Sequence, residues 1–349
     1  MKVLLTGSTG YIGRRLKQEL LNDENIELKL LVRNKKSISS LNENAQVVEG
    51  DTFNKESLKE ALKDVEVAYY LIHSLSNENY KDLDKISAQN FLDVANECGV
   101  KRIIYLGGLG VKNENTSEHL LSRIETGEIL SSNKNVQTIW LRAGVIIGSG
   151  SASFEIIRNL TEKLPIMTTP KWVNTKAQPI AVTDVLSYLH KSLYLDVKEN
   201  LIVDIGSEQL SYKNMMLKTA KVLGLKRILI TLPFISINLS SYWLNLFTPV
   251  PYAVAKALVE GLKSEVIIQN DHAKKYFPNI IPISYEDAVA NAIKEIEENQ
   301  VLSRWNDKSD DVWEKNSQNN ISKAIFIDRK EEDISNLNPS KVYQSFIGI

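Results

Sequence analysis

The sequence predicts an α/β fold in which a doubly wound parallel sheet carries a smaller C-terminal α/β lobe. Two observations support this prediction. The first 145 residues alternate short apolar runs with amphipathic stretches, which is typical of βαβ units in a sheet covered on both faces. After Gly148 the composition shifts to serine and glycine and then to Pro165, Pro170 and Pro179, which marks the end of this regular alternation.

The first half of the chain contains six candidate strands separated by candidate helices. Ile12, Leu16 and Leu20 recur every fourth residue, which places them on one face of a helix. Gly99 directly follows Cys98, as expected where a helix ends. The strands are expected at 3–6, 28–33, 46–49, 67–73, 102–106 and 137–142.

The second half predicts three helices, at 182–195, 212–223 and 285–298, and one strand at 201–205. We therefore expect a first domain at 1–148 and a smaller substrate-side lobe at 149–300 that partly completes the sheet. The remaining residues, 301–349, are expected to form a charged linker and the start of a C-terminal region, so that the chain is truncated or a shortened relative.

Composition narrows the classes of partner and compartment. The formal net charge is −1, so no basic excess points to nucleic acid as a partner. Cys98 is the only cysteine, which excludes an intrachain disulfide and favours a reducing compartment such as the cytoplasm. The histidines have no partners at metal-ligand spacing, so no metal site is expected. Composition does not indicate an oligomeric state.

One segment, 228–255, contains no charged residue and raises the question of a membrane. Prolines and polar residues interrupt its apolar run, which disfavours a transmembrane helix. The preferred interpretation is a buried or interfacial helix around 235–247 that lines an apolar pocket or makes peripheral contact with a membrane.

A glycine-rich turn, Gly7-Ser8-Thr9-Gly10-Tyr11-Ile12-Gly13, lies between the first strand and the first helix. Side chains at these glycines would block the tight turn or keep the backbone away from a diphosphate. The free N–H groups of the helix N-terminus would then face the phosphates. The position of the motif between a strand and a helix predicts a Rossmann-type dinucleotide-binding domain.

The second strand ends at Arg33, where an NAD-specific site usually has an acidic residue for the ribose 2′-hydroxyl. A guanidinium suits a 2′-phosphate, so NADP(H) is favoured over NAD(H). The alternative is that Arg33 is a solvated strand-end residue. Asp51, after the third strand, offers a carboxylate that could accept the adenine amino group.

Several stretches of the chain resemble a known protein family, and together they span about 300 residues. They are 7–13, Arg33, Asp51, 70–74, 141–148, 179–185 and 204–206. Together they resemble the atypical and extended short-chain dehydrogenase/reductases, and within them the NmrA-like NAD(P)-binding bacterial proteins loosely called nucleoside-diphosphate-sugar epimerases.

This resemblance implies that the dinucleotide lies across the C-terminal ends of the strands. It also implies a set of cofactor contacts spread over five strand ends. The implied contacts are Gly7, Thr9, Gly10, Tyr11, Ile12, Gly13, Arg33, Asp51, Thr52, Ile72, His73 and Gly107.

The chain departs from the family in its catalytic residues. The serine expected at the end of the fifth strand and the Tyr-x-x-x-Lys pair expected on the next helix are absent. His119 and Arg123 occupy the corresponding helix, four residues apart and on one face. Histidine can exchange a proton near neutral pH, and arginine can hold a ribose. The alternative for both is a solvated helix face, and the Tyr-x-x-x-Lys strings at 194–198 and 252–256 are expected to be chance matches.

The preferred functional hypothesis is an NAD(P)H-dependent oxidoreductase that acts on an apolar carbonyl or quinone-like substrate between the two lobes. The alternative is a non-catalytic dinucleotide-binding protein that senses redox state or supports assembly of a partner, as some NmrA-like proteins do. A sugar-nucleotide epimerase is a third and weaker hypothesis, because that chemistry also depends on the absent pair.

Overall fold

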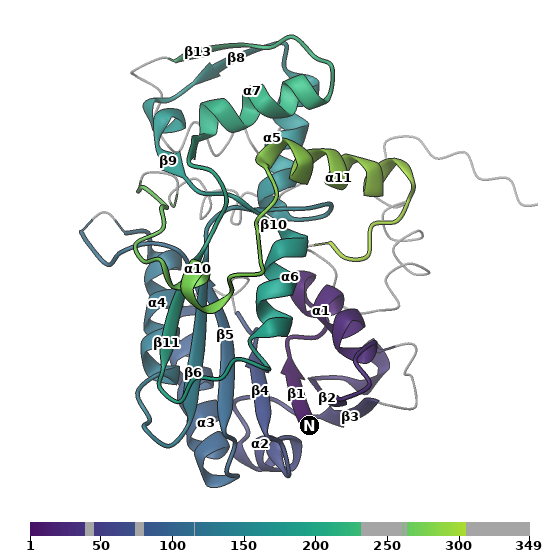
Figure 1. Cartoon of the computed structure of the whole chain (residues 1–349), viewed down its shortest axis with the longest axis vertical. Helices are drawn as coiled ribbons and strands as arrows, with labels where there is room; N and C mark the ends of the chain where they lie inside the picture. Colours follow the sequence, from purple (N-terminus) through teal and green to yellow (C-terminus); the bar gives the residue numbers. More distant parts are fainter. Residues whose placement is uncertain (39–44, 74–79, 115, 232–260, 262–263, 305–349) are drawn as a thin grey trace, which may run out of the picture. The chain divides into compact units, whose positions relative to one another are not determined.

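Seven parallel strands form the central sheet of the computed structural model (Figure 1). The structure describes residues 1–304 except 39–44, 74–79, 115, 232–260 and 262–263, and all of these belong to one structural unit, Met1–Asp310. The strands of the sheet are β1 Lys2–Thr6, β2 Glu27–Val32, β3 Ala45–Glu49, β4 Val67–Tyr70, β5 Arg102–Gly108, β6 Gln137–Ala143 and β11 Leu201–Ile205.

The strand order, β11-β6-β5-β4-β1-β2-β3, confirms the predicted doubly wound sheet. The chain starts in the middle at β1, runs outward through β2 and β3, and then returns to β4 on the other side. Because the direction of winding reverses between β1 and β4, their C-terminal ends flank a crevice, which is where ligands bind in sheets of this type.

Helices cover both faces of the sheet (Figure 1). On one face, Leu4 is buried with Phe91 and Leu120. On the other, Leu5 is buried with Leu16. Adjacent strand residues point to opposite faces, so the apolar runs predicted from the sequence supply both cores. The first face carries α2 Lys55–Leu62, α3 Tyr80–Glu97 and α4 Glu118–Leu130, and the second carries α1 Tyr11–Leu21 and α6 Val182–Lys191.

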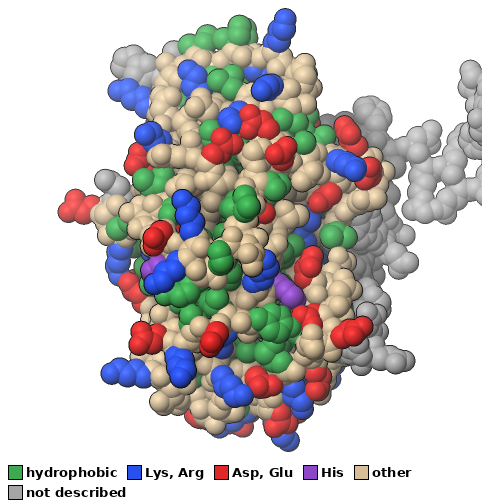
Figure 2. Space-filling view, viewed as in Figure 1, with side chains coloured by type: hydrophobic (Ala, Val, Ile, Leu, Met, Phe, Trp, Pro, Cys, Tyr) green, Lys and Arg blue, Asp and Glu red, His purple; other side chains and the backbone are tan. Residues whose placement is uncertain are grey.

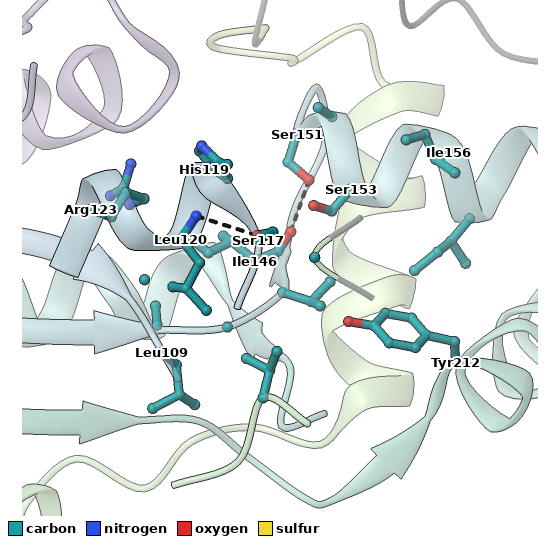
Figure 3. A pocket seen from close by; sticks show the side chains of 18 of the residues that line it. Leu109, Ser117, His119, Leu120, Arg123, Ile146, Ser151, Ser153, Ile156 and Tyr212 are labelled. Carbon is teal, nitrogen blue, oxygen red and sulfur yellow. Dashed lines mark hydrogen bonds between the residues drawn. The ribbon is translucent and has the colours of Figure 1, made fainter. Parts of the chain in front are cut away.

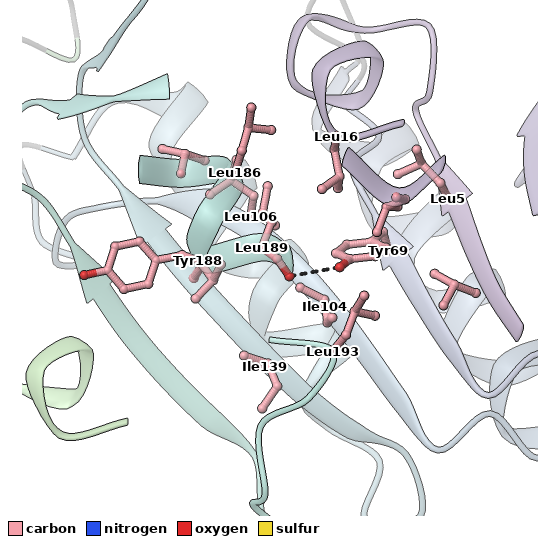
Figure 4. Packing of buried hydrophobic residues seen from close by; sticks show 14 of the residues in the cluster. Leu5, Leu16, Tyr69, Ile104, Leu106, Ile139, Leu186, Tyr188, Leu189 and Leu193 are labelled. Atoms are coloured by element: carbon pink, nitrogen blue, oxygen red, sulfur yellow. Dashed lines mark hydrogen bonds between the residues drawn. The ribbon is translucent and has the colours of Figure 1, made fainter. Parts of the chain in front are cut away.

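The core between the sheet, α1 and α6 contains one polar link (Figure 4). The Tyr69 hydroxyl, on β4, donates a hydrogen bond of 2.9 Å to the Leu189 carbonyl of α6. Leu5, Leu16 and Leu189 are fully buried around it. Burial of each such leucine contributes about 1.5–3 kcal/mol, so packing rather than the single hydrogen bond holds α6 on the sheet.

The strand predicted at 201–205 pairs with β6 as the last strand of the sheet. Arg142 of β6 donates two hydrogen bonds, of 2.6 and 3.0 Å, to the fully buried carboxylate of Asp204 on β11. The backbone N–H of Gln269 donates a third to the same carboxylate. This bidentate pair fixes β11 against β6 at the edge of the sheet.

A second hydrophobic core lies outside the sheet and is formed mainly by three helices, which we call the second lobe: α5 Ala152–Lys163, α7 Tyr212–Val222 and α11 Tyr285–Glu297. Helix α5 was not predicted, because the serines after Gly148 are typical of a loop. One of them, Ser151, instead caps α5 by accepting a hydrogen bond from the N–H of Phe154. The shorter elements of the lobe are β7 Ile146–Ile147, β8 Ile166–Thr169, β9 Lys176–Ala177, β10 Ile180–Ala181, β12 Leu210–Ser211, β13 Ile228–Thr231 and α10 His272–Tyr276.

The uncharged segment predicted at 228–255 is described only in part. Its first residues form β13, which pairs in parallel with β8. The rest, 232–255, lies outside the described residues, and with it the helix expected around 235–247. No helix in the part of the chain that the structure describes is long and apolar enough to cross a membrane.

Candidate functional site

The glycine-rich turn after β1 is closed by backbone contacts that exclude side chains. Gly7 has a φ of +70°, and a Cβ there would lie 2.4 Å from the Leu71 carbonyl oxygen of the neighbouring strand end. A Cβ at Gly13 would lie 2.0 Å from the Gly7 carbonyl oxygen. Both positions therefore require glycine, because the turn, the strand end and the first turn of α1 touch backbone to backbone.

The N-terminus of α1 presents its N–H groups without a capping side chain. Gly10 is the N-cap residue, and no acidic residue lies in the first turn. Thr9 turns its carbonyl inward to accept a hydrogen bond of 2.9 Å from Arg14 Nε. The first turn thus keeps a partial positive charge and unpaired N–H groups that suit a diphosphate.

The first turn of α1 is anchored to the second lobe through Arg15. This buried guanidinium donates to Glu295 of α11 at 3.0 Å and to the hydroxyl of Ser149 at 2.8 Å. It also lies 5.3 Å from the centre of the Tyr11 ring. The Ser303 hydroxyl donates to the Tyr11 carbonyl at 2.9 Å. The position of Tyr11 therefore depends on residues from both ends of the described chain.

At the end of β2, Arg33 is exposed and is followed by the exposed Lys35 and Lys36. The Glu49 carboxylate at the end of β3 accepts a hydrogen bond from the Lys35 N–H. Asp51, half-buried, accepts one from the Phe53 N–H at 3.0 Å. The predicted adenosine end thus has three neighbouring cations along one loop, an arrangement suited to an additional phosphate.

Two residues that the resemblance implies as cofactor contacts, Thr52 and Ile72, make contacts within the protein. Thr52 is almost completely buried, and its hydroxyl accepts a hydrogen bond of 2.7 Å from Ser87. Ser87 is in turn paired with the Tyr70 hydroxyl at 2.7 Å. Ile72 is half-buried and packs against the core formed with α3 and α4. The Thr52 carbonyl also accepts a hydrogen bond, of 3.1 Å, from the Asn90 side chain, so both its oxygens have internal partners.

His73, just beyond β4, lies beside His119 of α4. His73 Nδ1 is 2.7 Å from the Asp84 carboxylate of α3, and His73 Nε2 is 3.0 Å from His119 Nδ1. The Ser122 hydroxyl of α4 donates a hydrogen bond of 3.0 Å to the same oxygen of Asp84. His119, predicted as catalytic, is thus in hydrogen-bond contact with His73, predicted to contact the cofactor.

Both histidines of this group favour the neutral state. Burial lowers the pKa of His73, partly opposed by the hydrogen bond to Asp84. Burial holds the pKa of His119 well below its usual value, and the neighbouring His73 and Arg123 lower it further. His119 is therefore an uncharged hydrogen-bonding group at pH 7.

Arg123, predicted to grip a ribose, donates a hydrogen bond to the Leu106 carbonyl at the end of β5. The Tyr105 hydroxyl donates to the Arg123 carbonyl at 2.9 Å. Gly107 adjoins the same strand end, and a Cβ there would lie 2.3 Å from Trp140 Nε1. The end of β5 is consequently fixed by α4 and by the indole of β6.

A cavity of about 360 Å³ lies where these elements meet the second lobe (Figure 3). Tyr11 and Ile12 of the first helix line it, as do His119 and Arg123 of α4. Most of the remaining lining is apolar. It includes Leu109, Leu120, Val145, Ile146, Ile156, Ile157, Leu160 and Met216. A cavity of this size with few polar groups suits a small apolar ligand.

Sequence reasoning missed two residues of this site. Tyr212, at the start of α7, turns its hydroxyl towards the cavity (Figure 3), and burial raises the pKa of this phenol. Asp84 is a buried carboxylate near the N-terminus of the amphipathic helix α3, next to Leu83. The rarity of buried aspartate was the available signal for Asp84, whereas no sequence signal brings Tyr212 to the site.

The Tyr-x-x-x-Lys string at 194–198 lies away from the cavity. Tyr194 donates a hydrogen bond of 2.5 Å to Asp23, and with Lys198 it lies beside Lys101 and Arg102, at the N-terminal ends of the strands. That edge is opposite to the cavity. The string at 252–256 lies outside the described residues. No group of three histidine, cysteine or acidic side chains suited to a metal ion occurs among the described residues.

Comparison with known proteins identifies the class of the first domain. Residues 7–143 match the model of the NAD(P)H-binding family, so the chain contains an NAD(P)H-binding domain of Rossmann type. The predicted dinucleotide cofactor is thereby confirmed at the level of NAD(P)(H), and the glycine cradle fits it. The match is consistent with the resemblance to atypical short-chain dehydrogenase/reductases and NmrA-like proteins.

Particular relatives are similar in sequence or in fold. The auxiliary protein GraX of Staphylococcus aureus is 31% identical over 122 residues, which cover 32% of this chain and only 38% of GraX. Triphenylmethane reductase of Citrobacter sp. superposes with a TM-score of 0.68 at 21% identity, covering 84% of this chain and all of that one. A nucleoside-diphosphate-sugar epimerase of Staphylococcus aureus superposes with a TM-score of 0.66 at 16% identity, covering 83% and 100%. These two structures share the fold.

Proposed function

We propose that this protein is an NAD(P)H-dependent oxidoreductase of the atypical short-chain type, acting on an apolar carbonyl or quinone-like substrate. The observation that carries this proposal is the cavity itself. Its wall combines Tyr11 and Ile12, which belong to the dinucleotide-binding turn, with the apolar side chains of α5 and α7. A nicotinamide bound along the strand ends would therefore face an apolar chamber.

The residues of the cavity would bind and orient the substrate. The cofactor, when bound, supplies or accepts the hydride. His119 exchanges the proton that accompanies hydride transfer, and Arg123 holds the end of β5 against α4. Tyr212 keeps its proton because of its raised pKa, so it can donate a hydrogen bond to a carbonyl oxygen. A quinone requires less from a protein acid than a plain ketone, which fits the absence of the family's tyrosine.

The experiment compares turnover and cofactor binding. Purified protein is titrated with NADPH and NADH separately by calorimetry, and turnover is then measured with quinones, enones and aldehydes. His119→Ala should lower turnover about 100-fold or more while cofactor affinity stays within threefold of wild type. Glu118→Gln, an exposed change on the same helix, should change neither. Absence of turnover above background with every substrate would rule out this function.

The second candidate is a non-catalytic NAD(P) sensor or an assembly protein. It is favoured by the missing Ser/Tyr/Lys set and by the name of the matched relative, an auxiliary protein. Such a protein should bind the oxidised and reduced cofactors with different affinities and consume neither. The calorimetry already described distinguishes it from an enzyme. Epimerization of a sugar nucleotide is disfavoured by the apolar lining of the cavity.

We also propose peripheral membrane contact by the surface of β8 and β13. Ile166, Ile228 and Ile230 are 57%, 60% and 46% exposed, and the parallel register aligns Ile166 with Ile228. Figure 2 shows apolar side chains gathered over these strands with basic ones beside them. Residues 209–259 contain lysines and an arginine but no acidic residue. Exposed isoleucines beside cations fit an anionic lipid surface.

A further inference from the structure

A chain of three ionisable side chains leads from the cavity into the protein interior. It begins at His119, which lines the cavity, continues through His73, and ends at Asp84. The Asp84 carboxylate is almost completely buried, and the side chain of His73 is 14% exposed. The three residues come from α4, the end of β4 and α3, so each is held by a different element of the domain.

The hydrogen-bond geometry fixes where the protons lie. The Asp84 carboxylate also accepts from the Ser122 hydroxyl, so it acts as an acceptor and His73 Nδ1 donates to it. A neutral His73 then has an unprotonated Nε2, which accepts from His119 Nδ1–H. A neutral His119 is left with an unprotonated Nε2. The ring nitrogen that remains for a ligand is therefore a hydrogen-bond acceptor.

The charges around the chain keep both imidazoles neutral. His119 faces His73 from β4, Asp84 from α3 and Arg123 from its own helix, and the first and last of these disfavour its protonation. His73 faces the same arginine, together with the Asp84 carboxylate. A cationic His119 next to Arg123 would be costly in this partly desolvated site.

We propose that Asp84, His73 and His119 form a proton relay, and that the cavity therefore takes the hydroxyl form of an apolar substrate, an alcohol. This inference rests on the proposed function. His119 Nε2 accepts the hydroxyl proton while its Nδ1 proton moves to His73 Nε2 and the His73 Nδ1 proton moves to Asp84. The hydride of the alcohol carbon leaves to an oxidised nicotinamide and the C=O bond forms.

The relay has an advantage over proton transfer to His119 alone. At its end both imidazoles are again neutral, in the opposite tautomer, and Asp84 is a neutral carboxylic acid. No cation forms beside Arg123, so the transfer avoids the penalty that lowers the histidine pKa values. The same path in reverse delivers a proton to a carbonyl oxygen during reduction.

The tautomers of the two histidines can be measured in the resting protein, independently of turnover. Nitrogen-15 NMR of labelled histidine should show both His73 and His119 protonated at Nδ1 and unprotonated at Nε2 at pH 7. Asp84→Asn should invert both, because the amide can donate to His73 Nδ1 and thereby moves its proton to Nε2. Protonation of His119 at Nε2 in the wild-type protein would overturn the relay.

Kinetics test the transfer itself. With NADP⁺ and apolar alcohols, Asp84→Asn should lower kcat about 100-fold with little change in KM. His73→Gln can still accept from His119 Nδ1–H, so it should preserve the His119 tautomer and yet reduce kcat similarly. Glu118→Gln, an exposed change on α4 outside the relay, should leave kcat unchanged.

The outcomes separate the relay from the proposed function. If the wild-type protein turns over and both relay variants retain its kcat and pH profile, the relay is wrong and the oxidoreductase stands. If the wild-type protein oxidises no alcohol but reduces quinones or aldehydes, the assigned substrate form is wrong. If it turns over no substrate in either direction, the oxidoreductase and the relay fail together.

Discussion

Arg33 is the residue that we expect to distinguish the two nicotinamide cofactors. Its guanidinium is exposed at the end of β2, beside Lys35 and Lys36. Arg33→Ala should weaken NADPH binding on the order of tenfold and leave NADH binding nearly unchanged, because only NADPH carries the 2′-phosphate. Calorimetric titration of both cofactors measures this difference.

The control for Arg33 is Lys134→Ala. Lys134 is also exposed, but it lies at the N-terminal ends of the strands with Lys101 and Arg102. Removal of Lys134 changes the net charge by the same amount as removal of Arg33, and it should change the affinity for neither cofactor. Equal weakening of NADPH and NADH by Arg33→Ala would contradict the assignment of Arg33 to the phosphate.

His73 and His119 should also make the stability of the fold depend on pH. Their pKa values are lowered in the folded state, whereas the unfolded chain protonates histidine near pH 6.5. The stabilisation is therefore complete above about pH 6.5 and is lost as the pH falls, by up to about 1.4 kcal/mol per pH unit for each histidine. Urea unfolding between pH 7.5 and pH 5 measures the slope.

The comparison for this slope is a double variant, His73→Gln with His119→Gln. Its free energy of unfolding should decline less steeply with acidification than that of wild type, because the two protonation sites are gone. A slope identical to wild type would show that both histidines titrate alike in the folded and unfolded states.

At the scale of elements, the link between α1 and α11 is a buried ion pair near the site, and its loss should lower the stability of the fold. Arg15 is 3% exposed and pairs with Glu295, 280 residues away in the chain. Arg15→Met leaves the carboxylate of Glu295 and the Ser149 hydroxyl without this donor. The free energy of unfolding should fall by about 3 kcal/mol, and cofactor affinity should fall with it.

Arg158→Met provides the matched control for Arg15. Arg158 pairs with Glu155 and Glu162 within the single helix α5, three and four residues away. Such pairs within one helix contribute less than about 1 kcal/mol. Urea unfolding of the two variants should therefore differ by at least about 2 kcal/mol, and equal losses would show that the α1–α11 link has no special role.

At the scale of the whole molecule, the exposed isoleucines of β8 and β13 predict association with lipid. Ile228→Glu with Ile230→Glu should reduce cosedimentation with anionic phospholipid vesicles at least tenfold, since each inserted isoleucine contributes about 1.5–3 kcal/mol. Ile281→Glu, at a residue that is 84% exposed elsewhere, should leave binding unchanged. Equal binding to neutral and anionic vesicles would contradict the role of the basic residues.

The sequence by itself determined the doubly wound sheet, its first six strands and the dinucleotide turn. These features follow from local causes: apolar periodicity marks each strand and helix, and the steric need for glycine acts within residues 7–13. The strand predicted at 67–73 ends at Tyr70, and the Leu71 N–H donates to the hydroxyl side chain of Thr6 on β1 rather than to a backbone carbonyl of that strand. Such exits from a sheet depend on tertiary contacts.

Only the tertiary structure decided what surrounds His119. His73 and Asp84 precede it by 46 and 35 residues and meet it where a strand end and two helices converge. The sequence assigned His73 to the cofactor wall because a strand end marks that edge, but no local pattern encodes its hydrogen bonds to Asp84 and His119. Tyr212 likewise reaches the cavity because α7 packs against α5. Local pattern therefore fixed the elements, whereas long-range packing fixed the chemistry between them.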